Sequence, residues 1–231
     1  MGKVKETLKK IPLVQKLYRM VREPRFKASD SYWEGRYQSG GTSGPGSHGK
    51  LALFKAEVLN RFVKDNDVQT VIEFGCGDGN QLTLAEYPCY IGLDVALSAT
   101  QACANRFKDD PTKSFFLYDG RAFADNARVF SADLSMSLDV VYHLVEDQIY
   151  LKYMSDLFAS ARKYVVVYSS NEDKPASYHV RERKFTTWVD ANAPEWKLKE
   201  KLANPYHYDP KDVENTSIAD FYIFENATSP A

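Results

Sequence analysis

A run of glycines follows an apolar, β-branched segment, in a pattern that suits ligand binding. Residues 71–80 have the sequence VIEFGCGDGN. Gly75, Gly77 and Gly79 allow a sharp turn and bring backbone N–H groups close to a ligand, because no Cβ stands in the way. A helix beginning beyond the turn would add partial positive charge for an anionic ligand group. The run therefore predicts a ligand-binding strand-to-helix turn, with a plain tight turn as the alternative.

Two residues distinguish this run from a dinucleotide-binding turn. The third glycine of G-x-G-x-x-G would fall at position 80, where the chain has Asn80. The carboxylate of Glu73, inside the apolar strand end, would repel a pyrophosphate but suit cationic or N–H-bearing atoms. These residues disfavour the alternative function of a nicotinamide-dependent oxidoreductase on a related sheet.

The pattern E-x-G-x-G-x-G that begins at Glu73 resembles motif I of the class I S-adenosylmethionine-dependent methyltransferases. The resemblance extends over about residues 48–225 and implies S-adenosyl-L-methionine as cofactor. It implies that Asp94, ending the second strand, binds the ribose hydroxyls through charge-assisted hydrogen bonds. It also implies that Asp119, after the third strand, lies near the adenine amino group. An ordinary strand-end turn acid is the alternative for both.

Residues 32–37, YWEGRY, resemble the Y-W-x-x-R-Y entrance of several of these enzymes, which forms part of a lid over the methionine moiety. Aromatic rings stabilise a sulfonium by cation–π attraction, and Arg36 would pair with the amino-acid carboxylate. We expect this lid role for Tyr32, Arg36 and Tyr37 only, since Trp33 fits a hydrophobic anchor as well. The resemblance implies cofactor contacts from Tyr32, Arg36, Tyr37, Glu73, Gly75, Cys76, Gly77, Asp94, Val95, Asp119, Gly120, Ser137 and Leu138.

On the acceptor side, His143 follows the fourth strand, where ligands bind in open α/β sheets. A histidine with a pKa near 6.5 accepts a proton at neutral pH, which favours O-methylation with His143 as general base. A structural histidine is the alternative. Asp139 is the second candidate catalytic residue, and Tyr142 is a candidate for contact with the acceptor.

A basic cluster follows the fifth strand. On a predicted helix over 178–191, His179 and Arg183 share a face at i, i+4 spacing. Together with Arg181 they would grip an anionic acceptor such as a phosphate or sugar carboxylate, with a solvated helix face as the alternative. We expect no metal site: Asp139 and Asn171 resemble ligands of catechol-type methyltransferases, but serines replace the acidic partner before Asn171.

The succession of Y-W-x-x-R-Y, GGTSGPGS, FKAEVLN, motif I and SLDVVYHLVED resembles a bacterial methyltransferase group associated with surface-polysaccharide biosynthesis. This resemblance implies a small-molecule or glycan acceptor, methylated on a sugar hydroxyl or a sugar-linked phosphate. A non-catalytic cofactor-binding scaffold, docked through a basic N-terminus, remains a third hypothesis.

An alternation of strands and helices is expected to position these residues. Apolar runs buried on both faces favour a parallel sheet covered by crossover helices, and the last two runs favour an antiparallel hairpin. The expected class is α/β, a doubly wound, seven-stranded, mostly parallel, Rossmann-like sheet with an N-terminal helical extension. We predict strands at 68–74, 90–94, 114–118, 132–138, 163–170, 195–202 and 219–225, and helices at 29–39, 50–65, 79–87, 98–108, 121–127, 147–160 and 178–191.

The chain divides unevenly in charge. Residues 1–27 contain nine Lys and Arg against two acids, whereas the remainder contains 21 bases against 29 acids. An acidic body argues against nucleic acid as a partner. Residues 3–22 predict a basic amphipathic helix, split at Pro12, that would pack on the body or contact an anionic membrane. We assign residues 1–47 to a basic helical extension with a glycine-rich lid or linker, and 48–231 to the methyltransferase domain.

Cysteine usage and hydropathy indicate the compartment. Cys76, Cys89 and Cys103 form neither a metal-ligand spacing nor a disulfide framework, which favours a reducing cytoplasm. No apolar run approaches the roughly 20 residues that a membrane-spanning helix needs. We therefore expect a soluble protein, peripheral at the inner membrane face if residues 1–27 contact lipid.

Overall fold

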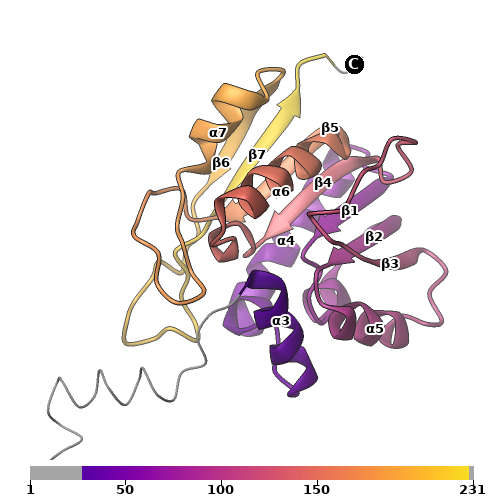
Figure 1. The fold of residues 1–231 in the computed structure, drawn as a ribbon. Coiled ribbons are helices and arrows are strands. Elements are labelled where there is room, and N and C mark those ends of the chain that lie inside the picture. The colour runs from indigo at the N-terminus through magenta and orange to yellow at the C-terminus, as the bar shows by residue number, and fades with distance from the viewer. Residues whose placement is uncertain (1–27, 229–231) are drawn as a thin grey trace, which may run out of the picture.

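The computed structural model describes residues 28–228, which form one twisted sheet between two layers of helices (Figure 1). The strands are β1 (Thr70–Phe74), β2 (Cys89–Asp94), β3 (Lys113–Leu117), β4 (Ala132–Leu138), β5 (Ala161–Ser169), β6 (Trp196–Leu202) and β7 (Asp220–Asn226). The helices are α3 (Ser29–Gln38), α4 (Gly49–Asp65), α5 (Leu97–Arg106), α6 (Asp147–Ala159) and α7 (Phe185–Asn192). The predicted helix over 3–22 lies outside the described residues.

The strand order β3-β2-β1-β4-β5-β7-β6 confirms the predicted sheet. Strands β1 to β5 pair in parallel, while β7 pairs antiparallel with both β5 and β6. From β1 the chain first adds strands on one side, β2 and β3, and then crosses to the other side with β4. In a doubly wound sheet, ligands bind in the crevice at this switch point between β1 and β4.

Two hydrophobic clusters hold the helices on opposite faces of the sheet. Leu59 and Phe62 of α4 pack with Leu134 and Val166 on one face. On the other face, residues of α6 such as Leu157 pack with neighbouring strand residues. In Figure 1, α6 lies in front of the strands and α4 behind them, with α3 at the carboxyl ends of the parallel strands. The sheet is therefore covered on both sides, and its carboxyl edge is free to form a site.

Two predicted helices are absent, and a third is shorter than predicted. Residues 79–87 contain only a 3₁₀ turn, Gln81–Leu84, because Gly79 has a positive φ of 72° and Pro88 follows shortly after. Residues 121–127 form turns rather than a helix. The Asp125 carboxylate accepts hydrogen bonds from the backbone N–H groups of Val129 and Phe130, which follow this segment.

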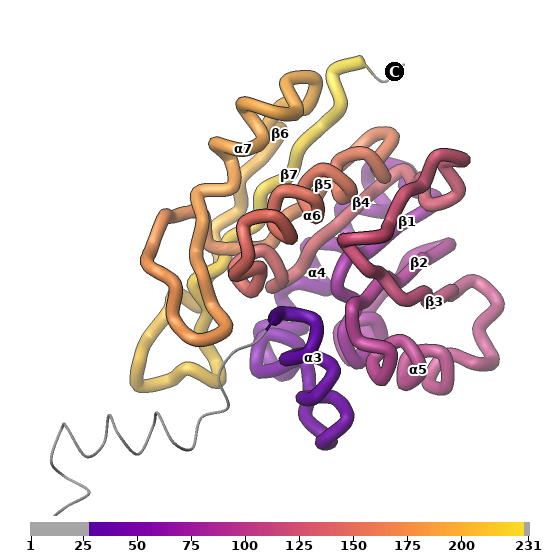
Figure 2. Tube along the Cα trace, in the orientation of Figure 1, coloured from indigo at the N-terminus to yellow at the C-terminus, as the bar shows by residue number. Residues whose placement is uncertain are grey.

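The predicted helix over 178–191 begins only at Phe185, so its first half is wrong. Tyr178 has a positive φ of 26°, and the N–H of Arg181 donates to the carbonyl oxygen of Tyr142 at 2.8 Å. Residues 170–184 therefore form a loop, and together with the loop 203–219 it extends beyond the carboxyl end of β5 (Figure 2).

Helix α3 occurs where the sequence predicts it. The helix begins at Ser29 itself, after Ala28, with no side-chain cap. The backbone N–H and the hydroxyl of Ser29 instead donate to the carboxylate of Glu146, at 2.9 and 2.6 Å. This contact fastens the start of α3 to the loop before α6.

Candidate active site

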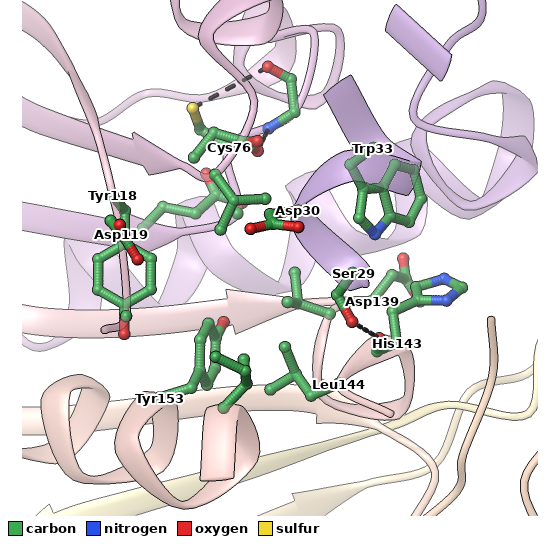
Figure 3. A pocket seen from close by; sticks show the side chains of 18 of the residues that line it. Ser29, Asp30, Trp33, Cys76, Tyr118, Asp119, Asp139, His143, Leu144 and Tyr153 are labelled. Atoms are coloured by element: carbon green, nitrogen blue, oxygen red, sulfur yellow. Dashed lines mark hydrogen bonds between the residues drawn. The ribbon is translucent and has the colours of Figure 1, made fainter. Parts of the chain in front are cut away.

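A cavity of about 1080 Å³ lies at the carboxyl ends of the central strands. Figure 3 shows Trp33 and His143 on one side of it, Tyr118 and Asp119 on the other, and Cys76 at its far end. Its lining includes twelve of the predicted site residues: Tyr37, Glu73, Gly75, Cys76, Gly77, Asp94, Val95, Asp119, Gly120, Leu138, Asp139 and His143. The fold thus gathers most of the predicted cofactor residues around one space.

The glycine turn closes against Asp94. The N–H of Gly77 donates to one carboxylate oxygen of Asp94 at 2.8 Å, and the N–H of Ala96 donates to the other at 2.9 Å. Burial raises the pKa of Asp94 to about 6, although both hydrogen bonds act in the opposite direction. Each oxygen keeps a lone pair, so this buried carboxylate can still accept hydrogen bonds from hydroxyl groups in the cavity.

Glu73 is a second buried acid in the cavity wall. Its Oε2 accepts a hydrogen bond from the Tyr90 hydroxyl at 2.5 Å. Burial raises the pKa of Glu73 to about 7, against this hydrogen bond and the nearby positive charge of Lys55. Two acids with raised pKa values in one cavity favour a cationic or hydrogen-donating ligand.

Asp119 connects the exit of β3 to helix α3. Its carboxylate accepts hydrogen bonds from the backbone N–H and Nε of Arg121, both at 3.0 Å. The same guanidinium contacts Asp30 on α3 at 2.8 Å. Because these groups are exposed, the pairs add little stability but close one side of the cavity.

The α3 residues that reach the cavity differ in part from the ones that the sequence predicts. Trp33 and Tyr37 line the cavity, whereas Tyr32 and Arg36 do not. Arg36 donates from Nε to the carbonyl oxygen of Thr42 at 2.6 Å, so it is held by the chain beyond α3. Tyr32 stacks on His179 with ring centroids 4.5 Å apart. The helix period places Trp33 and Tyr37 on the same face, which the sequence argument overlooked.

The glycine-rich segment (residues 40–48) covers the glycine turn. The Ser43 N–H donates to Asp78, and the Asp78 N–H donates back to the Ser43 hydroxyl, both at 3.0 Å. The Asn80 side chain donates to the carbonyl oxygen of Ser47 at 2.6 Å. A Cβ at Gly77 would lie 2.2 Å from the Ser43 Oγ, so this cover requires glycine there.

His143 follows β4 in a short 3₁₀ turn and has a fixed orientation. Its Nδ1 lies 3.0 Å from the carbonyl oxygen of His179, which can only accept, so Nδ1 carries the proton and Nε2 keeps its lone pair. Burial lowers the pKa of His143 to about 4. The imidazole is therefore neutral at physiological pH and able to accept a proton at Nε2.

Asp139 and Ser137 are held by neighbouring side chains. Lys55 Nζ donates to Asp139 Oδ2 at 2.6 Å, and the Tyr142 hydroxyl donates to Oδ1 at 2.8 Å. Because both oxygens are engaged, Asp139 is placed to orient its neighbours. Ser137 lies outside the cavity lining and accepts a hydrogen bond from the Tyr153 hydroxyl at 2.7 Å.

The predicted anion-binding cluster does not share a helix face, and none of its residues lines the cavity. Arg181 and Arg183 both pair with Asp147, at 3.0 and 2.8 Å, and both donate to the carbonyl oxygen of Val145 at 3.1 Å. These contacts fasten the loop 170–184 to the start of α6.

The Asn171 side chain forms hydrogen bonds with Thr186, and within residues 28–228 no group of three His, Cys, Asp or Glu side chains has metal-binding geometry.

The sequence analysis did not identify Lys55, which lines the cavity with only 1% of its side chain exposed. Its position among Leu51, Val58 and Leu59 on the apolar face of a helix is the signal that would have found it.

No protein-family model matches the chain. A curated protein from Arabidopsis thaliana, a small RNA 2'-O-methyltransferase, is 28% identical over 109 residues, which cover 42% of this chain but only 12% of the plant protein. The structure of N-methyltransferase NodS from Bradyrhizobium japonicum WM9, in complex with S-adenosyl-L-homocysteine, superposes with a TM-score of 0.65 at 16% identity, covering 87% of this chain and 99% of that one. The methyltransferase domain of bacterial CtHen1-C gives 0.56 at 19% identity, covering 74% and 96%.

These similarities and the strand order define the fold as that of the class I S-adenosylmethionine-dependent methyltransferases. The neighbours act on different acceptors, so the fold by itself assigns none. Because one curated relative methylates small RNA, the comparisons give no support to the sequence-based exclusion of nucleic acid. Within residues 28–228, every helix is too short or too polar to cross a bilayer.

Proposed function

We propose that this protein is an S-adenosylmethionine-dependent methyltransferase that methylates a hydroxyl group of a small-molecule or glycan acceptor. The observation that carries the proposal is the buried carboxylate of Asp94, which closes the glycine turn through Gly77 and lines the cavity. An acid in this place suits a vicinal diol, and the second buried acid, Glu73, suits the positive charge of a sulfonium compound.

The residues present fit the cofactor. The two raised pKa values identify carboxyl groups whose ionised forms are only partly compensated by the protein itself. Hydroxyl donors and a cation would supply the remaining compensation. Asp94 and the backbone of Gly77 would hold the ribose, Asp119 and Gly120 the adenine, and Trp33 and Tyr37 would enclose the methionine end.

The cofactor supplies an activated methyl group, so the chain must align the acceptor oxygen and remove its proton. His143 is suited to the second task, because its Nδ1 is committed to the His179 carbonyl and Nε2 is left as the acceptor atom. A pKa of about 4 makes the imidazole by itself a weak base. We infer that a bound hydroxyl donates to Nε2 and that the imidazolium forms only during transfer.

For the acceptor we favour a sugar hydroxyl, in line with the resemblance to a surface-polysaccharide group. A ribose 2'-hydroxyl is the second candidate, favoured by the similarity to a small RNA 2'-O-methyltransferase. Both are hydroxyl groups on sugar rings and require the same proton acceptor. The sequence predicts that His179, Arg181 and Arg183 bind an anionic acceptor. We do not propose this role, because these side chains contact other residues of the protein.

Isothermal titration with S-adenosylmethionine and its demethylated product tests the cofactor assignment. We expect binding to the unaltered protein, loss of binding in Asp94→Ala and unchanged binding in Asp190→Ala, an exposed acid on α7. If neither compound binds the unaltered protein, the proposal fails. Transfer of radiolabelled methyl groups to sugar, sugar-phosphate and small RNA fractions then identifies the acceptor. Cofactor binding without transfer to any fraction would favour the non-catalytic scaffold.

A further inference from the structure

Lys55 is a fully buried lysine on the otherwise apolar face of α4. Only 1% of its side chain is exposed, and it lines the cavity. Its Nζ donates to Asp139 Oδ2 at 2.6 Å and lies 5.3 Å from the centre of the Tyr168 ring. Burying an ammonium group is costly unless it is paired, so the site preserves this ion pair against a substantial desolvation cost.

Asp139, the partner of Lys55, adopts a strained backbone conformation. Its φ is +60°, in the left-handed region that residues with a Cβ rarely occupy. Such a conformation persists only where surrounding contacts enforce it. The carboxylate supplies those contacts, since Oδ2 binds Lys55 and Oδ1 accepts the Tyr142 hydroxyl at 2.8 Å.

The same turn carries His143. The ring centroid of Tyr142 lies 4.6 Å from that of His143, and the carbonyl oxygen of Tyr142 accepts the Arg181 N–H at 2.8 Å. That bond holds the loop whose His179 carbonyl fixes the His143 tautomer. A continuous chain of contacts therefore runs from Lys55 through Asp139 to Tyr142. Tyr142 lies beside the His143 ring and, through Arg181, holds the loop whose His179 carbonyl binds that ring.

The glycine-rich segment encloses this cluster from the other side. A Cβ added at Gly46 would lie 2.7 Å from Asp139 Oδ2 and 3.2 Å from its carboxyl carbon. Backbone at Gly46 thus packs directly on the carboxylate and limits the access of bulk water to the ion pair. In a water-poor environment the attraction between Lys55 and Asp139 is less screened, which makes the geometry of the pair well defined.

We infer that Lys55 is a positioning residue for His143, acting through Asp139 and Tyr142. The inference rests on the role of His143 given under the proposed function, and it adds a residue whose side chain does not touch the imidazole. Without the ammonium group, the Asp139 carboxylate would turn towards solvent in the cavity and release the Tyr142 hydroxyl. The turn would then lose its strained conformation, and His143 would no longer be held against the His179 carbonyl.

Nitrogen-15 NMR of the histidine side chains at pH 7.5 tests the inference without acceptor or cofactor. In the unaltered protein we expect a single His143 tautomer, protonated at Nδ1. Lys55→Met keeps an unbranched side chain that is one atom shorter, and it removes the charge. In this variant we expect the Nε2-protonated tautomer to reach about a tenth of the population or more, because the hydrogen bond of the other nitrogen sets the tautomer. Lys64→Met, an exposed lysine on the same helix, is the matched control and should leave the spectrum unchanged.

Retention of the single Nδ1-protonated tautomer in Lys55→Met would overturn the inference. If Lys55→Met does not fold, Tyr142→Phe decides the question, since it removes only the hydroxyl that donates to Asp139. We expect the same tautomer shift in that variant, and an unchanged His143 signal would overturn the inference as well. Failure of S-adenosylmethionine to bind the unaltered protein is a separate result and refutes the proposed function instead.

Discussion

Replacement of Glu73 by Gln is predicted to stabilise the protein at alkaline pH while weakening cofactor binding. Glu73 is buried, and its pKa is raised from 4.5 to about 7. Because a tenfold change in proton affinity corresponds to about 1.4 kcal/mol, the ionised carboxylate costs the folded state about 3 kcal/mol. The substituted glutamine would keep an oxygen acceptor for the Tyr90 hydroxyl but would carry no charge.

The sign of the pH dependence follows from proton linkage. Because the folded-state pKa is the higher one, the folded protein binds this proton more tightly than the unfolded chain. Stability from Glu73 is therefore lost as the pH rises from about 4.5 through about 7. The difference in unfolding free energy between Glu73→Gln and the unaltered protein should grow by about 2 kcal/mol between pH 5 and pH 8.

Urea unfolding of both proteins at pH 5, 6, 7 and 8 measures this difference, with Glu57→Gln, an exposed acid on α4, as control. A difference that does not change with pH would show that the Glu73 carboxyl titrates normally, and the electrostatic account of the cavity would be wrong. Titration with S-adenosylmethionine at pH 8 should show weaker binding in Glu73→Gln, since the cation loses its counter-charge.

Three further predictions concern the cover, the basic loop and the N-terminus. Gly77→Ala places a methyl group against Ser43 at a positive φ, so we expect about 1–3 kcal/mol of lost stability in thermal unfolding and loss of cofactor binding; wild-type affinity would contradict the described cover. Arg183→Met removes a guanidinium that binds Asp147 and two carbonyl oxygens, so urea unfolding should show a loss of about 1–2 kcal/mol in unfolding free energy, with unchanged cofactor affinity. An unchanged unfolding free energy would show that these contacts do not stabilise the fold and would again favour acceptor binding by Arg183. Anionic liposomes should sediment the full chain but not a variant without residues 1–27, and equal sedimentation would exclude the basic segment as the membrane contact.

The sheet and the cofactor end of the site were predictable because their signals are local. Strand β5 contains a continuous apolar run over 164–168, β1 begins with the β-branched residues 70–72, and the glycine turn follows β1 directly in sequence. Asp94 is 17 residues from Gly77, yet parallel pairing of β1 with β2 brings the ends of the two strands together. In such a sheet, strand ends that are neighbours in the strand order meet at one edge whatever the intervening helix does.

The acceptor side was less predictable because its contacts link distant segments. Lys55 and Asp139 are 84 positions apart in the chain, and neither residue type alone indicates an ion pair. Residues 178–184 belong to the helix predicted over 178–191, but the hydrogen bond from Arg181 to Tyr142 and the backbone of Tyr178 place them in a loop. Tertiary partners outweigh local propensity in such segments.

Both covers of the cavity, α3 and the glycine-rich segment, belong to the single stretch 28–48 that precedes the first strand. Hydrogen bonds hold both ends of this stretch. The Ser29 hydroxyl donates to Glu146 at one end, and the Asn80 side chain donates to the Ser47 carbonyl oxygen at the other. Polar contacts of this kind exchange with water at a small net cost, whereas the sheet beneath keeps its apolar packing. We therefore expect this stretch to open more readily than the sheet, so that release of a bound cofactor would depend on groups that take no part in the chemistry.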